Sequence, residues 1–588
     1  MPMSMRILFI FFLLLPPVLY AQVKAIWVVS DGEKVLRENL NHPSKKGNLV
    51  WDGSKIKLKG LYNEVLAFQV IVESGTDSVA NLEVAIDAPV DKGRGNVIGG
   101  SSLKYGPSGT IELFSEHYLH VTDSTPPDWH YGSPAAFNRP MTGWIPDALI
   151  PADALPGRGG FPVDMGPLNN QAFWIDVHLP RDQKKFAPTV YTGSVSVIQG
   201  GKTISNIPLE ITLVANYLPD DNRQNVWMYS SDVYPYYPSM SREQVDEMLK
   251  FEAHRHRIDM VGGFSVNKDR FNASGMDKYK PYLDGTAFTP ENGYYGPGAG
   301  IGEKLFPVGM YSSPVLGTTK EDMQKQSDLW VNWFNKNSPS AKYFWYIIDE
   351  PRKDKHEWIR ERANWVKKNP GPGKSLPVFT TTRYQKEIDD VIDIFAAFDG
   401  ADLNDLAAAR MNGGDHWFYN GNRPRIGSLI LEGAAIDFRV SPWILYKYGI
   451  NTWFIWHGTQ WRHNMQGPKK HLHQNVFQNP VTFINEHLEI SNGEGVVVYP
   501  GHMPFYEEEE RGLNRIIPSI RFKNIRRGQQ DAALMWMAEQ KIGREKVIEM
   551  ISKVLPKALS EVSMKDATQW SEKGDDYDRV REALIKLL

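Results

Sequence analysis

Two adjacent acidic residues, Asp349 and Glu350, are the strongest candidates for chemistry in this sequence. They follow an apolar and aromatic run, residues 343–348, which lacks polar alternation and is typical of a strand buried on both faces. Pro351 has no backbone N–H to donate to a sheet, so the strand must end there. The two acids are therefore predicted at the C-terminal mouth of a buried strand, where α/β folds place their catalytic groups.

Two roles are open for Asp349 and Glu350: capping a helix, or catalysis. Acids before a proline are common at a helix N-terminus, and a helix is expected from about residue 353. Alternatively, repulsion between adjacent carboxyls, with desolvation by Trp345 or Tyr346, would raise one pKa. Such a pair suits glycoside hydrolysis, in which one carboxyl keeps its proton while the other stays ionised.

The elements that must position this pair form an alternating series after residue 219. The predicted strands are 226–230, 258–264, 304–309, 343–348, 377–382, 392–398, 416–419 and 452–456. The predicted amphipathic helices are 241–255, 320–336, 356–368, 402–411 and 436–448, and segment 263–301 is expected to be mostly loop. Eight strands with interleaved helices predict an α/β fold, a (β/α)8 TIM-like barrel, over residues 220–490.

Residues 22–219 carry β signals instead. Short β-branched or alternating runs at 25–30, 65–73, 82–86, 110–114, 173–179, 191–198 and 207–215 are separated by Gly, Asn, Asp and Pro. They predict an antiparallel β-sandwich of immunoglobulin-like type, interrupted by a long Pro- and Gly-rich loop over 122–170. Residues 491–588 are expected to form a C-terminal extension of one strand and several helices.

The N-terminal segment and the composition bear on compartment and partners. Residues 1–21 combine Arg6 with an apolar run at 7–15, typical of a secretory signal peptide cleaved after Ala21, and the run is too short to span a bilayer. With no cysteine, the exported chain has no disulfide, which favours a bacterial periplasm or secretion to the medium. A net charge of −3 gives no electrostatic case for nucleic acid. The 12% aromatic content suits a glycan partner, and nothing in the sequence fixes an oligomeric state.

Several segments in the same order resemble a known family. The stretch Trp345-Tyr-Ile-Ile-Asp-Glu-Pro351 resembles the Asp-Glu-Pro strand of glycoside hydrolase family 123 and its relatives. Supporting resemblances lie at 416–424 (Trp-x-Tyr strand end), 443–461 (last helix and strand of the barrel) and 493–501 with 518–528 (C-terminal signature). Segments 63–72 and 144–151 are similar to segments that precede these barrels, so the resemblance spans nearly the whole chain after the signal segment.

The resemblance implies an exo-acting β-N-acetylhexosaminidase of the β-N-acetylgalactosaminidase type. In its substrate-assisted mechanism the 2-acetamido oxygen of the sugar attacks the anomeric carbon. Carried over, Asp349 would orient and stabilise the acetamido nitrogen, and Glu350 would act as general acid and then as general base. An internal nucleophile supplies a high effective molarity, and no second enzyme nucleophile is required. Asp-Glu-Pro also occurs in more distant barrels, so it supports a glycosidase better than it supports N-acetylgalactosamine.

Substrate contacts are expected at the ends of the other strands. Trp456 is predicted as a sugar platform and Tyr419 as a donor to the acetamido carbonyl; burial in the barrel core is the competing role for such aromatics. The remaining candidates for substrate binding are Trp417, His457, Arg383, Asn404 and Asp232.

Two other functions are compatible with this sequence. Glu432, after the apolar run 426–431, could be the nucleophile of an ordinary two-carboxylate glycosidase on another sugar, or simply an acid at a helix start. A non-catalytic carbohydrate-binding protein could share the fold. The histidines lack metal-site spacing, and Gly296–Gly302 lacks the strand and the Lys-Ser/Thr ending of a phosphate loop, so neither metal nor cofactor is expected.

Overall fold

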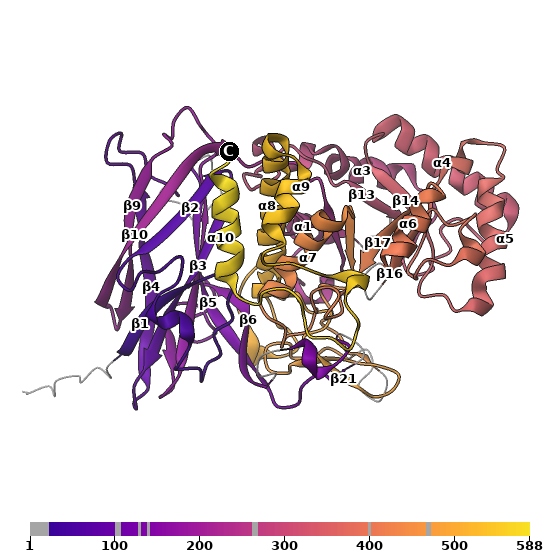
Figure 1. Cartoon of the computed structure of the whole chain (residues 1–588). Coiled ribbons are helices and arrows are strands. Elements are labelled where there is room, and N and C mark those ends of the chain that lie inside the picture. Colours follow the sequence, from indigo (N-terminus) through magenta and orange to yellow (C-terminus); the bar gives the residue numbers. More distant parts are fainter. Residues whose placement is uncertain are drawn as a thin grey trace, which may run out of the picture.

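The computed structural model describes residues 23–99, 108–127, 131–137, 142–261, 268–397, 402–465 and 472–588. The predicted signal peptide lies outside these residues. Within them, an N-terminal pair of sheets, a ring of parallel strands and a set of C-terminal helices lie side by side (Figure 1).

The N-terminal part is built from two five-stranded sheets. Their strands are β1 Val23–Ser30, β2 Ile56–Tyr62, β3 Val65–Ser74, β4 Val79–Val90, β5 Thr110–Val121, β6 Gly143–Pro151, β7 Val163–Met165, β8 Asn170–His178, β9 Val190–Gln199 and β10 Lys202–Tyr217. One sheet has the antiparallel order β1-β3-β8-β5-β6, and the other has the order β2-β10-β9-β4-β7 with β2 and β10 parallel. Apolar side chains from both sheets, among them Phe68, Phe173 and Ile211, form one buried cluster. The immunoglobulin-like topology stays a prediction.

Strand β6 corrects the prediction of a continuous loop over 122–170. Its nine residues pair with β5 at the edge of the first sheet. Pro146 hid this strand in the sequence, because proline inside a run argues against a central strand. An edge strand tolerates proline, since one side of its ladder is unpaired.

The barrel is confirmed. Eight parallel strands run in the order β12-β11-β18-β17-β16-β15-β14-β13. Their bounds are β11 Asn225–Tyr229, β12 Asp259–Val261, β13 Leu305–Val308, β14 Lys342–Ile348, β15 Val378–Thr380, β16 Ile394–Ala397, β17 Asp415–Tyr419 and β18 Thr452–Ile455. The ring is nearly closed, with β12 and β13 as its two edges.

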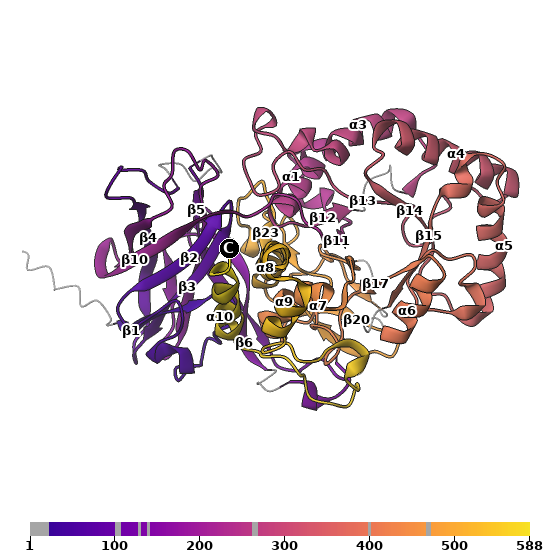
Figure 2. The same ribbon diagram turned by 45° about the horizontal axis from the view of Figure 1, so that its top comes forward.

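Helices cover the outside of this ring. They are α1 Arg242–Arg255, α3 Ala273–Asp284, α4 Lys320–Asn337, α5 His356–Lys367, α6 Leu403–Met411 and α7 Ile436–Tyr448. Figure 2 shows α3, α4, α5 and α6 outside the barrel strands. Helix α3 lies within segment 263–301, which was predicted to be mostly loop. At its N-terminus the Asn272 side chain accepts a hydrogen bond from Gly275 N.

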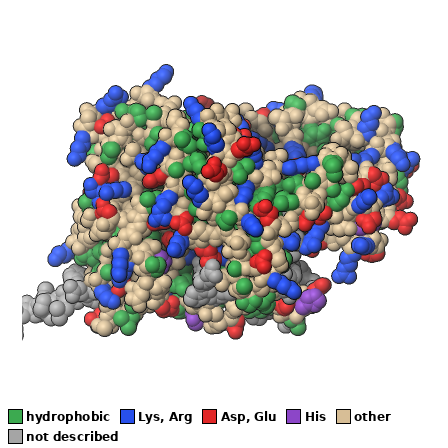
Figure 3. Space-filling model, in the orientation of Figure 1, with side chains coloured by type: hydrophobic (Ala, Val, Ile, Leu, Met, Phe, Trp, Pro, Cys, Tyr) green, Lys and Arg blue, Asp and Glu red, His purple; other side chains and the backbone are tan. Residues whose placement is uncertain are grey.

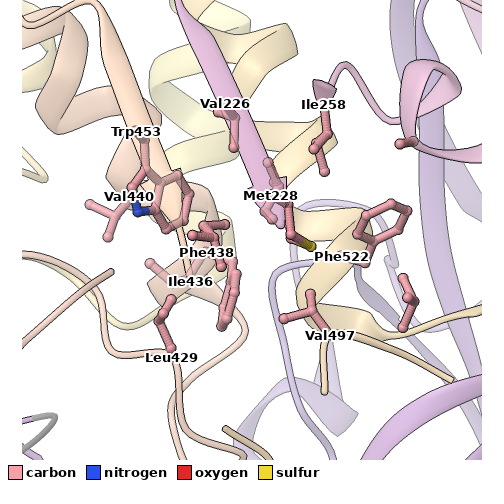
Figure 4. Packing of buried hydrophobic residues seen from close by; sticks show 14 of the residues in the cluster. Val226, Met228, Ile258, Leu429, Ile436, Phe438, Val440, Trp453, Val497 and Phe522 are labelled. Carbon is pink, nitrogen blue, oxygen red and sulfur yellow. The ribbon is translucent and has the colours of Figure 1, made fainter. Parts of the chain in front are cut away.

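The chain after β18 returns to both halves of the molecule. It contains the short strands β19 Asn464–Met465, β20 Val481–Ile484, β21 Ile490–Asn492, β22 Val498–Tyr499 and β23 Ile517–Pro518, and the helices α8 Ile520–Ile542, α9 Arg544–Ile551 and α10 Gly574–Ile585. Helix α8 lies between the N-terminal sheets and the barrel, and α10 lies against the sheets (Figure 1). Val226 and Met228 of β11 pack toward α7 and α8, where they meet Phe438 and Phe522 (Figure 4).

Successive side chains of strand β14 alternate between the inside and the outside of the barrel. Phe344 and Tyr346 point into the barrel interior, while Trp345 and Ile347 pack with the helices outside it. Both faces are therefore apolar, as the unbroken run predicted. This fixes the register at which the strand ends, and so the place of Asp349 and Glu350.

In the described part of the chain, no helix is both long and apolar enough to cross a bilayer. Acidic and basic side chains are interspersed over the face seen in Figure 3.

Candidate active site

A cleft of about 440 Å³ opens at the C-terminal ends of the barrel strands. Its lining residues are Tyr229, Ser231, Asp232, Tyr311, Asp349, Glu350, Tyr419, Asn420, Trp456, His457, Gln460, Arg462, His463, Phe483 and Glu494. They follow β11, β13, β14, β17 and β18, or belong to the segment after the last barrel strand. This is the end of a barrel at which catalytic groups gather.

Backbone strain is concentrated around this cleft. The non-glycine residues with positive φ at its edge are Asp232 (58°), Tyr311 (47°), Ser312 (64°), Glu350 (39°) and Asn420 (57°). Such conformations cost about 1–3 kcal/mol each and cluster at functional sites. For Glu350 the consequence is geometric: neighbours on a strand point to opposite faces, and the turn at Glu350 lets both acids line one cleft.

Asp349 is held in one orientation by two hydroxyl groups. Its Oδ1 accepts from the Tyr346 hydroxyl at 2.5 Å and from Thr381 Oγ1 at 2.7 Å. Its backbone N–H donates to Ser312 Oγ at 3.2 Å. Burial raises the pKa of Asp349 above its ordinary value, and the two hydroxyl donors act against this rise. Both donors converge on one oxygen, and Oδ2 accepts no hydrogen bond from any residue that the structure describes.

Glu350 is tuned to hold a proton near neutral pH. Burial, followed by the charge of Asp349, raises its pKa to about 7, and Glu494 adds to the rise. A hydrogen bond with the Tyr419 side chain lowers it in part. The Glu350 backbone N–H donates to Thr381 Oγ1 at 2.8 Å, so one threonine hydroxyl touches both acids. A carboxyl with this pKa can act as an acid in one step and a base in the next.

Aromatic side chains form the walls. Trp456 is half-buried and packs edge-on against Phe483, with ring centroids 5.5 Å apart. Its backbone is fixed at both ends, since Trp456 N donates to Asn420 Oδ1 at 2.8 Å and its carbonyl accepts from the Tyr311 hydroxyl at 2.5 Å. An aromatic wall beside two carboxyls suits the apolar face of a sugar ring.

His457 is a neutral histidine in this cleft. Its Nδ1 accepts from Thr459 N at 3.1 Å, which leaves the proton on Nε2, 2.9 Å from Ser231 Oγ. Burial, with the nearby charge of Lys268, lowers its pKa to about 3. His457 therefore offers a fixed hydrogen-bond donor to Ser231, and Asp232 lies exposed at the rim beside it.

Six of the nine residues predicted for the site line this cleft: Asp349, Glu350, Tyr419, Trp456, His457 and Asp232. The other three, Trp417, Arg383 and Asn404, do not. The structure places these three outside the cleft lining, and their part in substrate binding stays a prediction.

Each of the three has its own reason. Trp417 is fully buried one layer below Tyr419, where its ring packs on Phe344 (5.2 Å between centroids) and its Nε1 donates to Asp415 at 2.9 Å. Arg383 is exposed beyond the end of β15. Asn404 is exposed in the first turn of α6, where its N–H donates to the Asp402 carboxylate at 2.8 Å.

Glu432, the alternative nucleophile, does not line the cleft either. It is fully buried, and its Oε1 accepts from Thr125 N at 2.8 Å and from Asn492 Nδ2 at 2.6 Å. These contacts tie the N-terminal part of the chain to the segment after the barrel. Two residues beyond Asn492 comes Glu494, which does line the cleft.

Sequence reasoning missed Glu494, Arg462, Thr381 and Tyr346. Tyr346 and Thr381 lie at the ends of β14 and β15, so strand-end reasoning could have found them. Glu494 and Arg462 follow the last barrel strand, and only the return of the chain brings them to the cleft. Among the described residues no group of three His, Cys, Asp or Glu side chains is arranged to hold a metal ion.

Comparison with known proteins shows the fold. No model of a known protein family and no curated protein matches this sequence. The structure is similar to a family 123 glycoside hydrolase from Clostridium perfringens, described in connection with glycolipid glycan hydrolysis. The TM-score is 0.63 at 12% identity, over 96% of this chain and 98% of that one. The chain therefore has the fold of a family 123 glycoside hydrolase, as the sequence resemblance implied.

Two further structures are more distant. They are a family 39 glycoside hydrolase from Bacteroides cellulosilyticus (9% identity, 76% and 80% of the two chains, TM-score 0.28) and a GH2 beta-galacturonidase from Eisenbergiella tayi (10%, 87% and 72%, TM-score 0.27). At these TM-scores the two matches carry no argument about this chain.

Proposed function

We propose that this protein is an exo-acting glycoside hydrolase, a β-N-acetylhexosaminidase of the β-N-acetylgalactosaminidase type that retains configuration through the 2-acetamido group of its substrate. The observation that carries the proposal is the paired environment of the two acids. Glu350 keeps a proton to about pH 7, while Asp349 has one oxygen fixed by two hydroxyl donors and the other open. The fold shared with a family 123 glycoside hydrolase supports it.

In the first step the acetamido oxygen of the substrate attacks its own anomeric carbon. The bond from that carbon to the leaving oxygen breaks, and Glu350 gives this oxygen its proton. The acetamido nitrogen becomes positively charged in the oxazolinium ion that forms. Its N–H can donate to Asp349 Oδ2, whose carboxylate stabilises the charge because Tyr346 and Thr381 occupy Oδ1.

In the second step water opens the cyclised sugar. Glu350, now ionised, takes the proton from the attacking water, and the anomeric carbon regains its original configuration after two inversions. Trp456 would pack against the sugar ring, and Tyr419 would move its hydrogen bond between Glu350 and the acetamido carbonyl. We also propose export to the periplasm or the medium, on the basis of the signal segment in residues 1–21.

The position of Glu494 is the observation that best supports the alternative, a two-carboxylate retaining mechanism. Glu494 is a third carboxylate in the cleft, and its charge acts on Glu350. An ordinary retaining glycosidase would use it as the nucleophile and Glu350 as the acid, and would act on sugars without a 2-acetamido group. Glu494, which lines the cleft, is therefore a better candidate for this nucleophile than Glu432, which does not.

The test compares the wild type with Asp349→Asn, Glu350→Gln and Glu494→Gln. We expect the wild type to release the aryl group from aryl β-N-acetylgalactosaminide or β-N-acetylglucosaminide, and Asp349→Asn to lose about 100-fold or more of kcat/KM. A thiazoline mimic of the cyclised intermediate should inhibit the wild type strongly.

Normal turnover by both Asp349→Asn and Glu350→Gln would refute the proposed hydrolase function of this site. Weak thiazoline inhibition, together with a covalent sugar adduct on Glu494, would establish the two-carboxylate mechanism instead. Absence of turnover with binding retained would favour a carbohydrate-binding protein.

A further inference from the structure

An unpaired cation lies in the cleft. Arg462 lines the cleft, and it makes no side-chain hydrogen bond or ion pair with any residue in the described part of the chain. Its Nε is buried and without a partner there. A half-buried guanidinium with five N–H donors is costly to leave unsatisfied, so it is a candidate to bind oxygen atoms of a ligand.

His473 lies next to Arg462 on the neighbouring segment of the chain. Arg462 and His473 are paired in an antiparallel β-bridge. Residues opposite each other in such a pair project to the same face, about 5 Å apart at Cβ. The side chain of His473 is therefore expected beside that of Arg462, which lines the cleft, and the charge of Arg462 does lower the pKa of His473. The exposed Asp232 also acts on His473, since its charge raises the pKa of His473 while that of Arg462 lowers it.

The imidazole ring of His473 supports a second, exposed aromatic ring, that of Phe505. Phe505 stacks on it with ring centroids 3.4 Å apart and planes 11° apart, and Phe505 is 42% exposed. Tyr236 holds the edge of both rings, at 5.4 Å from each. The part of the Phe505 ring that does not pack on His473 or Tyr236 is open to solvent, so it is free to pack against a ligand.

The stack is held rigidly. The Tyr236 hydroxyl donates to the Trp461 carbonyl at 2.6 Å, so it accepts from His473 Nδ1 at 3.1 Å. The Tyr506 hydroxyl donates to the His473 carbonyl at 2.9 Å, which fixes the loop that carries Phe505. Burial lowers the pKa of His473, and Arg462 adds to this, so its ring is a neutral, flat support. A preorganised ring loses little entropy on binding.

We propose that the exposed face of Phe505 is the platform for the sugar residue on the leaving-group side of the scissile bond, and that Arg462 donates hydrogen bonds to oxygen atoms of that residue. This rests on the proposed function. The ligand is a carbohydrate leaving group, because an aromatic face next to a forked donor matches the apolar face and the equatorial hydroxyls of a pyranose ring. The natural substrate is then an oligosaccharide or glycoconjugate in which a further sugar follows the residue that is removed.

The experiment compares two substrates with the same non-reducing sugar. One is the β-N-acetylhexosaminyl fluoride, which has no leaving sugar, and the other is a disaccharide with a hexose as leaving group. Phe505→Ala should lower kcat/KM for the disaccharide by about three- to ten-fold and leave the fluoride unchanged. Phe505→Trp, which keeps an aromatic face, should keep the disaccharide rate. Tyr295→Ala is the matched control, since Tyr295 is a comparably exposed aromatic residue (36%) that lines a different cavity with Arg181 and Pro290; it should change neither rate.

The outcomes separate the two proposals. Equal loss on both substrates, or no loss on either, would overturn the platform while leaving the hydrolase assignment in place. Failure of the wild type to cleave either substrate would instead remove the proposed function, and the platform with it. Because the fluoride rate also reports folding, a misfolded Phe505→Ala variant would be recognised, and Phe505→Leu, similar in bulk but without an aromatic face, would then decide the question.

Discussion

Glu350 owes its chemistry to the groups around its carboxyl. Burial and the adjacent Asp349 charge raise its pKa, and Tyr419 holds that rise in check. The same residue in water would be ionised at neutral pH and useless as an acid. The local turn at φ 39° is part of this arrangement, since it keeps both carboxyls in one cleft.

These pKa shifts predict a bell-shaped pH dependence of kcat/KM for hexosaminides with a poor leaving group. Glu350 must be protonated, so activity should fall as the pH rises through about 7. Asp349 must be ionised, and since burial raises its pKa, activity should fall on the acid side above the ordinary aspartate range. The measurement is kcat/KM against pH for an alkyl β-N-acetylhexosaminide.

Two controls sharpen this prediction. The glycosyl fluoride needs no proton on its leaving group, so its profile should lack the alkaline limb. Tyr419→Phe removes the hydrogen bond that lowers the pKa of Glu350 and should move the alkaline limb to higher pH. An alkaline limb that persists in Glu350→Gln would assign it to another group.

At the scale of elements, the neighbouring strands β14 and β15 together position the two acids of the site. Strand β14 brings the acids, and Thr381, just past β15, fixes them. Parallel pairing sets this contact: Ile348 lies opposite Thr380, so the next residues on both strands meet at the mouth of the barrel. The Thr381 hydroxyl thus accepts a hydrogen bond from the backbone N–H of Glu350 and donates one to the carboxylate of Asp349.

Replacing Thr381 by valine should therefore separate positioning from chemistry. The isosteric change leaves Glu350 N without its acceptor and removes one donor from Asp349. We expect kcat/KM to fall on the order of 100-fold, as for a reacting group displaced by about 1 Å. The loss in free energy of unfolding should be only about 1–2 kcal/mol.

Thr381→Ser is the matched control, because it keeps the hydroxyl. It should retain most of the activity, and the alkaline limb should stay near its wild-type position. Loss of activity in Thr381→Ser equal to that in Thr381→Val would show that the methyl group, and not the hydroxyl, matters.

The elements also show what a sequence can predict here. All eight barrel strands were found from apolar runs, and the strand-end rule placed Asp349, Glu350, Tyr419 and Trp456 in one cleft. The rule failed for Trp417, because alternate inward residues of one strand occupy different layers and only the upper one reaches the mouth. Glu494 and Arg462 come from beyond the barrel, and no local pattern indicates where such a segment returns.

At the scale of the whole molecule, buried charges join the N-terminal sheets to the C-terminal helices α8 and α10, which pack between the sheets and the barrel. Helix α8 carries Arg527, whose guanidinium contacts Asp31 after β1 (3.5 Å), Glu64 before β3 (3.2 Å) and Asp578 of α10 (3.1 Å). All four side chains are buried. Thr125 makes a second link, since it contacts both Glu432 and Asn492 close to Glu494. The sheets therefore support the cleft without lining it.

Because of these contacts, we expect the sheets and the barrel to unfold as one cooperative unit. Arg527→Met keeps the bulk of the side chain and leaves Asp31, Glu64 and Asp578 short of a counter-charge, which should cost about 3–5 kcal/mol in the free energy of unfolding. The measurement is guanidinium denaturation followed in parallel by tryptophan fluorescence and by hydrolytic activity, with hydrogen exchange to compare the two parts. Arg360→Met is the matched control, since Arg360 forms an exposed pair with Asp390 and should cost less than about 1 kcal/mol. If hydrogen exchange in Arg527→Met rises in the sheets alone while the barrel keeps its protection, the two parts are independent, and the buried charges hold only the sheets to α8 and α10.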